Sequence, residues 1–333
     1  MDEPLDLAGA LMRERVRARL LGATPRSLRI GRFELERPCG GGGEGQVFAA
    51  RDTVGQTRVA LKCLNSVRAG EQAALQHEFR ALSHIVHPNL VSMQELFCVD
   101  GAWFFTMELL EGSDVVQHVA ARPAEIRDVL RQLLSGLAAM HDAGFVHRDV
   151  KPSNVLVEPS GRVVLVDFGL VVARGDARGA GGTPAYMAPE QLRGEALTPA
   201  ADLYAVGAIL FELLTGRRLK GRPRAIQGAL GVLCTALLAA DPAQRPTAHE
   251  ALARLDVHSE AQRPAREARF VGRAIELARL QAAWSGLREP RILLMHGESG
   301  IGKSALLAEL ARRVPAHALV LRGRCYERES TPY

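Results

Sequence analysis

The chain has 333 residues, of which 47% are hydrophobic and 24% charged, a composition typical of a soluble globular protein with room for roughly two domains. Its net charge of +5 arises between residues 257 and 333, where 13 Lys and Arg stand against 8 Asp and Glu; without interleaved aromatic residues, this surplus predicts a solvated basic surface and no nucleic-acid partner. Five scattered cysteines without Cys-x-x-Cys spacing argue against a disulfide framework and for a cytoplasmic location, and no apolar run approaches the length of a membrane span.

An arginine-rich helix is predicted within residues 1–32, because Leu5, Met12, Val16 and Leu20 recur at helical spacing. Such a helix could dock on the domain that follows or on a partner. We expect instead a loosely held, solvated helix.

A β-rich region is predicted to begin at Phe33. Its first three segments are short and β-like, at residues 33–37, 47–50 and 59–64. Between the first two, Gly40, Gly42 and Gly45 follow a Gly-x-Gly-x-x-Gly pattern, in which backbone amides can close over phosphate groups. A dinucleotide-binding fold would need a helix directly after the glycines, whereas another β segment follows here.

Lys62 lies in the third β segment and should project from it toward phosphates held under the glycines. The next predicted helix, at residues 71–84, carries two acidic candidates to pair with it, Glu71 and Glu78. We favour Glu78 because it lies nine residues before His87, where the chain should turn after the helix.

Residues 104–110 predict a buried strand that runs into a connector, which Gly112 interrupts. A connector of this kind offers backbone amide and carbonyl groups to the edge of an adenine ring. The following segment, 124–142, has apolar residues every three or four positions, which predicts a helix with one core-facing side.

The chemistry-bearing stretch runs from His147 to Asn154 and is followed by Asp167. Two short apolar runs separated by a turn at residues 158–161 lie between them, so both polar clusters should sit at the ends of a β-hairpin. One carboxylate, a lysine, an amide and a second carboxylate are thereby brought together. Phosphoryl transfer requires a proton acceptor, a cation near the moving group and oxygen ligands for Mg²⁺.

Lysine is rare in this sequence, which takes nearly all its positive charge from arginine. The four lysines are Lys62, Lys151, Lys220 and Lys303, and three of them fall in phosphate-handling motifs. In such a sequence, a lysine indicates a position where a compact ammonium group is needed.

These motifs, in this order, carry a resemblance: residues 33–256 resemble a bacterial Ser/Thr protein kinase of the eukaryotic-like type. The resemblance implies an α+β, two-lobed kinase fold with a β-rich N-lobe and a helical C-lobe. It implies a protein substrate, which could include the chain itself, and ATP with Mg²⁺ as cofactors.

The resemblance also implies a role for each matching residue. Asp149 would be the catalytic base and Lys151 the cation beside the transferred group, while Asn154 and Asp167 would bind Mg²⁺. Lys62 would hold the α and β phosphates, with Glu78 fixing it. The remaining ATP-binding residues would be Cys39, Gly40, Gly42, Gly45, Val47, Ala60, Met107 as gatekeeper, Glu108 and Leu110 through their backbones, and Asp114 near the ribose.

The segment after Asp167 departs from the family's regulated members. Residues 170–182 contain no Ser, Thr or Tyr, and the first hydroxyl is that of Thr183. Phosphorylation usually orders this loop through an arginine such as Arg148. We therefore predict that phosphorylation within 170–182 does not activate the kinase.

The C-lobe should be shortened, because only 25 residues separate Thr215 from Asp241. The resemblance implies that Asp202 braces the catalytic loop and that Arg245 pairs with Glu190. The short interval puts the usual docking of peptide substrates in doubt.

After a linker at 257–269, a second motif follows a predicted helix and strand. Gly297, Gly302, Lys303 and Ser304 belong to a Gly-x-x-x-x-Gly-Lys-Ser loop, which cradles phosphates at a helix N-terminus. Residues 270–333 resemble the start of an AAA-like α/β P-loop NTPase. The sequence ends before a Walker B aspartate, so we expect an incomplete module from a longer protein or a truncated gene product, with weak nucleotide binding.

The sequence thus predicts four parts: a helical extension (1–32), a kinase domain (33–256), the linker and the partial NTPase domain. The expected function is ATP-dependent phosphorylation of Ser or Thr in a cytoplasmic signalling pathway. One alternative is a nucleotide-binding regulatory scaffold, in which the kinase fold is an input domain for the ATPase. A second makes the P-loop ATPase the main activity. The remainder of the ATPase module would be a further partner if the natural chain is longer.

Overall fold

The computed structural model divides the chain into two compact units, Met1–Ala261 and Gln262–Tyr333. The residues that it describes are 7–21, 27–42, 45–64, 72–167, 172–173, 183–221, 226–257, 274–285, 306–307, 310 and 313.

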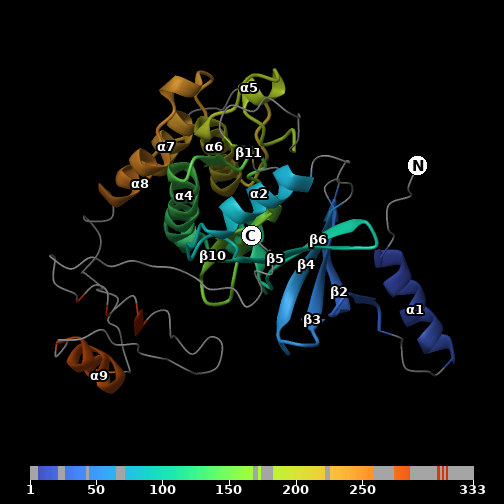
Figure 1. Cartoon of the computed structure of the whole chain (residues 1–333). Coiled ribbons are helices and arrows are strands. Elements are labelled where there is room, and N and C mark those ends of the chain that lie inside the picture. The colour runs from blue at the N-terminus through green and yellow to red at the C-terminus, as the bar shows by residue number, and fades with distance from the viewer. Residues whose placement is uncertain are drawn as a thin grey trace. The chain divides into compact units, whose positions relative to one another are not determined.

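The first part of unit 1 is a six-stranded antiparallel sheet in the order β1-β2-β3-β4-β6-β5 (Figure 1). Its strands are β1 (Arg29–Ile30), β2 (Phe33–Gly42), β3 (Gly45–Asp52), β4 (Arg58–Leu64), β5 (Met93–Val99) and β6 (Ala102–Glu108). The three segments predicted at 33–37, 47–50 and 59–64 are therefore confirmed as strands, and β4 lies inside the sheet between β3 and β6.

The N-terminal helix α1 (Leu7–Leu21) packs on this sheet, contrary to the expectation of a loosely held helix. Leu7 and Leu11 are each only 6% exposed and join an apolar cluster of sheet residues, whereas Met12 is 63% exposed. Of the four residues whose spacing predicted this helix, Met12 and Val16 are exposed, and Leu5 and the side chain of Leu20 lie outside what the structure describes. An arginine-rich helix with leucines on several sides leaves the choice of face to the surface on which it docks.

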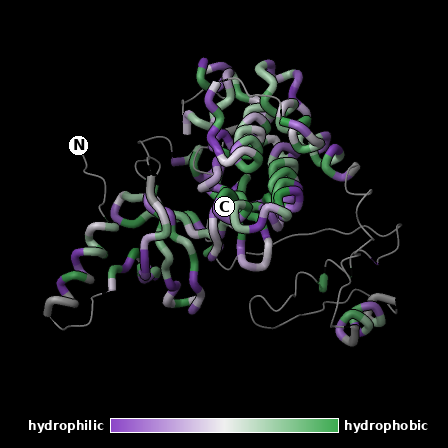
Figure 2. The backbone as a smooth tube through the Cα atoms, turned by 180° about the vertical axis from the view of Figure 1, so that it is seen from behind, coloured by the Kyte–Doolittle hydropathy of each residue, from purple (hydrophilic) through white to green (hydrophobic). Residues whose placement is uncertain are grey.

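A larger, mainly helical part follows. Its elements are α3 (Val115–Ala121), α4 (Ile126–Asp142), α5 (Pro189–Leu192), α6 (Pro199–Thr215), α7 (Ala229–Leu237) and α8 (Ala248–Val257), with single 3₁₀ turns at Pro123–Glu125, Pro152–Asn154 and Pro242–Gln244. The core side of α4 is fully buried, as its period of three and four predicts. Figure 2 shows the hydrophobic segments gathered inside this helical part. Between α6 and the turn at Pro242–Gln244, α7 is the one helix among the described residues.

The predicted hairpin is present within the helical part, between α4 and α5 in sequence. Strands β9 (Val155–Val157) and β10 (Val163–Leu165) pair antiparallel, and β7 (Ser113–Asp114) adds to the free side of β9. A second small sheet pairs β8 (Phe145–Val146) with β11 (Val172–Ala173). Helix α2 (Gln72–Ser83) precedes β5 and buries Phe79 and Leu82.

Unit 2 contains α9 (Ala274–Ser285) as its main described element. The loop residues predicted to bind a second nucleotide, Gly297, Gly302, Lys303 and Ser304, lie outside the described residues. Within the described part of the chain, no helix has the length and apolar character needed to cross a bilayer.

Candidate functional site

The stretch from His147 to Asn154 forms a loop between β8 and β9 in which residues 147–150 and Asn154 are buried. Arg148 has φ +69°, a left-handed conformation that is strained for a residue with a side chain. The carboxylate of Asp202 on α6 holds this backbone in place, since its oxygens accept hydrogen bonds from the amides of His147 and Arg148, both at 2.8 Å. The loop conformation therefore depends on a residue more than fifty positions away.

Asp202 is fully buried and also accepts a hydrogen bond from His141 Nε2 at 2.8 Å. Burial alone would raise the pKa of Asp202, but the hydrogen bond and charge of His141, with the amide of His147, outweigh burial and lower the pKa of Asp202. The carboxylate is therefore ionised at neutral pH and able to brace the loop, the role that the resemblance implies for it.

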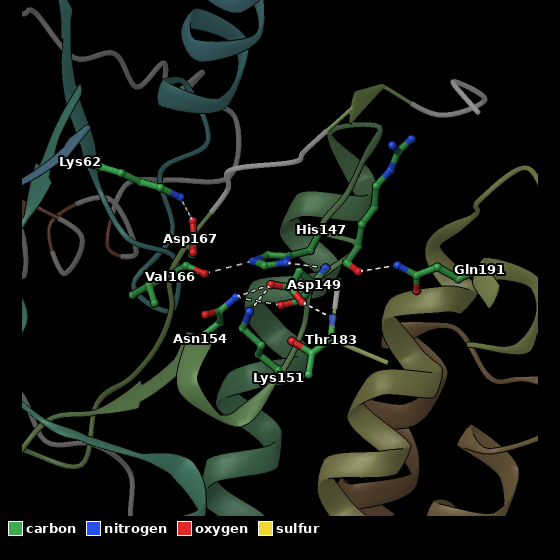
Figure 3. A network of polar contacts seen from close by, with 10 residues as sticks. Lys62, His147, Asp149, Lys151, Asn154, Val166, Asp167, Thr183 and Gln191 are labelled. Carbon is green, nitrogen blue, oxygen red and sulfur yellow. Dashed lines mark hydrogen bonds and ion pairs between the residues drawn. The ribbon is translucent and has the colours of Figure 1, made fainter. Parts of the chain in front are cut away.

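Asp149 stands at the centre of a polar network (Figure 3). Its Oδ2 accepts hydrogen bonds from Lys151 Nζ at 2.5 Å and from Asn154 Nδ2 at 3.2 Å. Its Oδ1 accepts one from the backbone amide of Thr183 at 3.1 Å. Both carboxylate oxygens are thus oriented, and the group can accept a proton from a hydroxyl placed beside it.

Asn154 has a defined orientation, because its Nδ2 also donates to the backbone carbonyl of Asp149 at 2.9 Å. The side-chain oxygen Oδ1 of Asn154 is therefore on the side of the amide group that faces away from these two contacts. An amide oxygen together with a carboxylate is the type of ligand set that Mg²⁺ takes with phosphate oxygens. The donor chemistry of Asn154 and Asp167 therefore fits the predicted magnesium pair.

Lys62 and Asp167 form an ion pair although 105 positions separate them. Lys62 is buried in β4, and Asp167 follows β10 with φ +67°. His147 Nε2 donates to the carbonyl of Val166 at 3.1 Å, which ties the loop at 147–154 to the residue before Asp167. Glu78 is half-buried on α2, and its pairing with Lys62 stays a prediction.

The glycine-rich region forms the β2–β3 hairpin. Gly40 lies opposite Val47, and Gly42 opposite Gly45. Gly45 has φ +146°, and a Cβ there would lie 2.0 Å from the carbonyl oxygen of Cys63, so only glycine fits. Residues 43–44 are outside the described part, and the predicted contact residue Cys39 is exposed on β2.

The predicted adenine-side residues lie close to Lys62 in the sheet. Val47 faces Lys62 across β3 and β4, and Ala60 faces Met107 across β4 and β6. Ala60 and Met107 are buried. The pairing register of β3, β4 and β6 therefore brings together residues that were expected to line one ATP pocket.

The connector, residues 108–112, begins at the last residue of β6. The amide of Glu108 donates to Ser92 O at 2.9 Å, and Leu110 is half-buried. Asp114, predicted near a ribose, has one carboxylate oxygen in the N-cap of α3, where it accepts from the amides of Val116 and Gln117 at 2.9 Å each. Its predicted ribose contact would thus involve the other oxygen.

Arg245 and Glu190 form a bidentate, buried ion pair with distances of 2.5 and 2.8 Å, which confirms the predicted pairing. Sequence reasoning missed two contacts: the amide of Thr183 at Asp149, and Arg162 at Glu108. Backbone amides leave no trace in a residue pattern, and an arginine in a turn of an arginine-rich chain does not stand out. The segments 168–171 and 174–182 lie outside the described residues, so the expectation for activation remains a prediction.

Comparison with known proteins gives two matches to protein families. The protein kinase domain family matches residues 33–229, and the AAA ATPase domain family matches residues 269–333.

Among curated proteins, serine/threonine-protein kinase PrkC of Bacillus subtilis is 34% identical over 199 residues, which cover 56% of this chain and 31% of PrkC. Serine/threonine-protein kinase pkn3 of Myxococcus xanthus is 36% identical over 207 residues, covering 56% of this chain and 38% of that protein. Serine/threonine-protein kinase PknL of Mycobacterium tuberculosis H37Rv is 38% identical over 197 residues, with 56% and 49% covered. The chain thus spans less than half the length of these relatives. It belongs to the protein kinase domain family, and its residues 269–333 are a segment of an AAA ATPase domain.

Proposed function

We propose that this protein is a Ser/Thr protein kinase that transfers the γ-phosphoryl group of ATP to hydroxyl groups of proteins in a cytoplasmic signalling pathway. One observation carries the proposal: the carboxylate of Asp149 is oriented on both oxygens, beside Lys151 and Asn154, in the same network as the Lys62–Asp167 pair. Kinship with proteins named serine/threonine-protein kinases supports it.

In this proposal, each polar group of the network has one task. Asp149 orients the substrate hydroxyl and accepts its proton as the phosphoryl group moves. Lys151 balances the negative charge that develops beside Asp149, and Lys62 holds the α and β phosphates. Asn154 Oδ1 and Asp167 would hold Mg²⁺, whose charge neutralises the phosphate oxygens.

The ATP pocket is proposed to lie under the β2–β3 hairpin. The backbones of Glu108 and Leu110 would bind the adenine edge, and Ala60, Val47 and Met107 would contact the ring. Cys39, Gly40, Gly42 and Gly45 would cover the nucleotide from above, and Asp114 would bind the ribose. Glu78 would fix Lys62.

A second nucleotide site is proposed at Gly297, Gly302, Lys303 and Ser304. The match of residues 269–333 to an AAA ATPase domain supports this assignment, since the motif places backbone amides and a lysine around phosphates.

Transfer of radiolabel from [γ-³²P]ATP to a generic protein substrate tests the kinase proposal. Asp149→Asn should lower the transfer rate by about 10²- to 10⁴-fold, because a positioned proton acceptor contributes a factor of that size. Asp142→Asn is a matched control, since Asp142 is exposed and pairs with His249 on the surface. Equal labelling by wild type and Asp149→Asn would contradict the proposal. Labelling that survives in Asp149→Asn and is lost in Lys303→Ala would assign the chemistry to the ATPase segment.

A further inference from the structure

One guanidinium group joins three separate segments at the edge of the proposed nucleotide pocket. Arg162 precedes β10 and donates from Nη1 and Nη2 to the two carboxylate oxygens of Glu108, at 2.6 and 3.0 Å. Its Nε donates to the carbonyl of Pro88 at 2.8 Å. Arg162 therefore links the first residue of the connector, the loop between α2 and β5, and the β9–β10 hairpin.

The turn that carries Arg162 is itself held firmly. Gln132 on α4 donates to Gly161 O at 2.9 Å and accepts from the amide of Val163 at 3.0 Å. Asn89 Nδ2 donates to Val163 O at 2.7 Å and to Gln132 Oε1 at 3.0 Å. The hairpin turn, α4 and the loop at 87–90 thus form one hydrogen-bonded unit, from which Arg162 reaches the connector.

The other end of the connector is fixed to the same hairpin by backbone contacts. Ser113 pairs with Val157 where β7 meets β9. At Gly112, a Cβ would lie 2.4 Å from Val157 O, so the connector approaches β9 too closely for any other residue. The connector is therefore held at both ends: β7 and Gly112 fix its C-terminal end, and the Glu108–Arg162 pair fixes its N-terminal end.

The pair has the properties of a structural clamp. Both side chains are 30% exposed, and bidentate pairing of arginine with a carboxylate fixes orientation as well as distance. The hydrogen bonds to Glu108 raise the pKa of Arg162 above its already high value despite partial burial. Arg162 also lies 3.5 Å from Glu158 in its own turn.

We propose that Arg162 is a positioning residue that fixes the position of the connector relative to the β9–β10 hairpin, so that both ends of ATP are bound at once. The inference rests on the proposed function, in which adenine binds the connector and the phosphates bind beside Asn154 and Asp167. Those two residues flank the hairpin on which Arg162 stands. ATP must span the distance that Arg162 fixes, whereas adenosine contacts the connector side alone.

The test compares the Kd values of MgATP and adenosine by isothermal titration calorimetry. For Arg162→Met, we expect the Kd of MgATP to rise about tenfold, equivalent to about 1.4 kcal/mol, and that of adenosine about twofold or less. Arg131→Met is the matched control, because Arg131 is 28% exposed and pairs with Asp128 and Asp256 on α4 and α8. It should leave both Kd values at the wild-type level.

Glu108→Gln provides an independent test, since it removes the negative charge from the second member of the Glu108–Arg162 pair. It should reproduce the change in the ratio of the two Kd values, and the double variant should show no further change. Equal losses for both ligands, or an unchanged Kd of MgATP in folded Arg162→Met, would overturn the inference. Failure of wild type to bind MgATP at Asn154 and Asp167, seen as no loss of binding in Asp167→Ala, would instead refute the proposed function.

Discussion

Replacement of Asp202 by Asn tests whether a buried carboxylate holds the catalytic loop. The change keeps the shape of the side chain but removes its charge and one acceptor. In its better orientation, the Asn oxygen would still accept from His147 N and His141 Nε2, the two donors that now bond Oδ2. The Asn NH₂ group would then face the amide of Arg148, which now donates to Oδ1 at 2.8 Å, so two donors would oppose each other.

The magnitude follows from these contacts. Loss of a hydrogen bond to a charged acceptor costs about 1.5–3 kcal/mol, and a buried donor left unsatisfied costs about 1–3 kcal/mol. The two terms overlap, so we expect Asp202→Asn to lower the free energy of unfolding by about 3 kcal/mol. Arg148, no longer held at φ +69°, would relax from a conformation strained by about 1–2 kcal/mol, and Asp149 would move with it. The transfer rate should fall about 100-fold, as expected when a reacting group is displaced by about 1 Å.

The assay is urea unfolding followed by far-UV circular dichroism, combined with the radiolabel measurement. Because the chain divides into two units, only the transition of residues 1–261 should shift. Asp142→Asn, which alters an exposed Asp–His pair, should change stability by less than about 0.5 kcal/mol. A loss below about 1 kcal/mol for Asp202→Asn, together with full activity, would refute the proposed support of the loop.

Two further predictions concern acid stability and the N-terminal helix. The pKa of Asp202 is lowered in the folded protein, so its stabilising effect is complete above the unfolded pKa of about 3.9 and is lost as the pH falls from there toward the folded pKa. Below about pH 4, the urea midpoint of wild type should therefore fall more steeply with decreasing pH than that of Asp202→Asn. Parallel curves of urea midpoint against pH would contradict this prediction. Leu11→Asp should release α1 from the sheet, because it places a charge where Leu11 is 6% exposed and removes about 1.5 kcal/mol or more of apolar burial. Limited trypsin digestion within α1 should become about tenfold faster in Leu11→Asp. Met12→Asp, at a 63% exposed position, should not change the digestion rate. Equal rates for both variants would show that the docking of α1 does not depend on Leu11.

Local sequence determined the elements of the site. The alternation of apolar runs and turn residues predicted the β9–β10 hairpin with Asn154 and Asp167 at its ends, and the structure has this arrangement. The three strands that carry the glycines and Lys62 were also predictable, since glycine and β-branched residues act on the backbone within a few positions. Motif order then indicated phosphoryl transfer, and kinship with protein kinases agrees with it.

Tertiary structure decided which of these groups meet. Lys62 pairs with Asp167, 105 positions away, and Arg162 reaches Glu108, 54 positions away. The docked face of α1 contains Leu7 and Leu11 because the sheet offers an apolar surface at that point, whereas Met12 and Val16, which the helical spacing singled out, are exposed. Partners of this kind depend on how strands and helices pack, and the pattern of residues along the chain records only which side chains are able to pair.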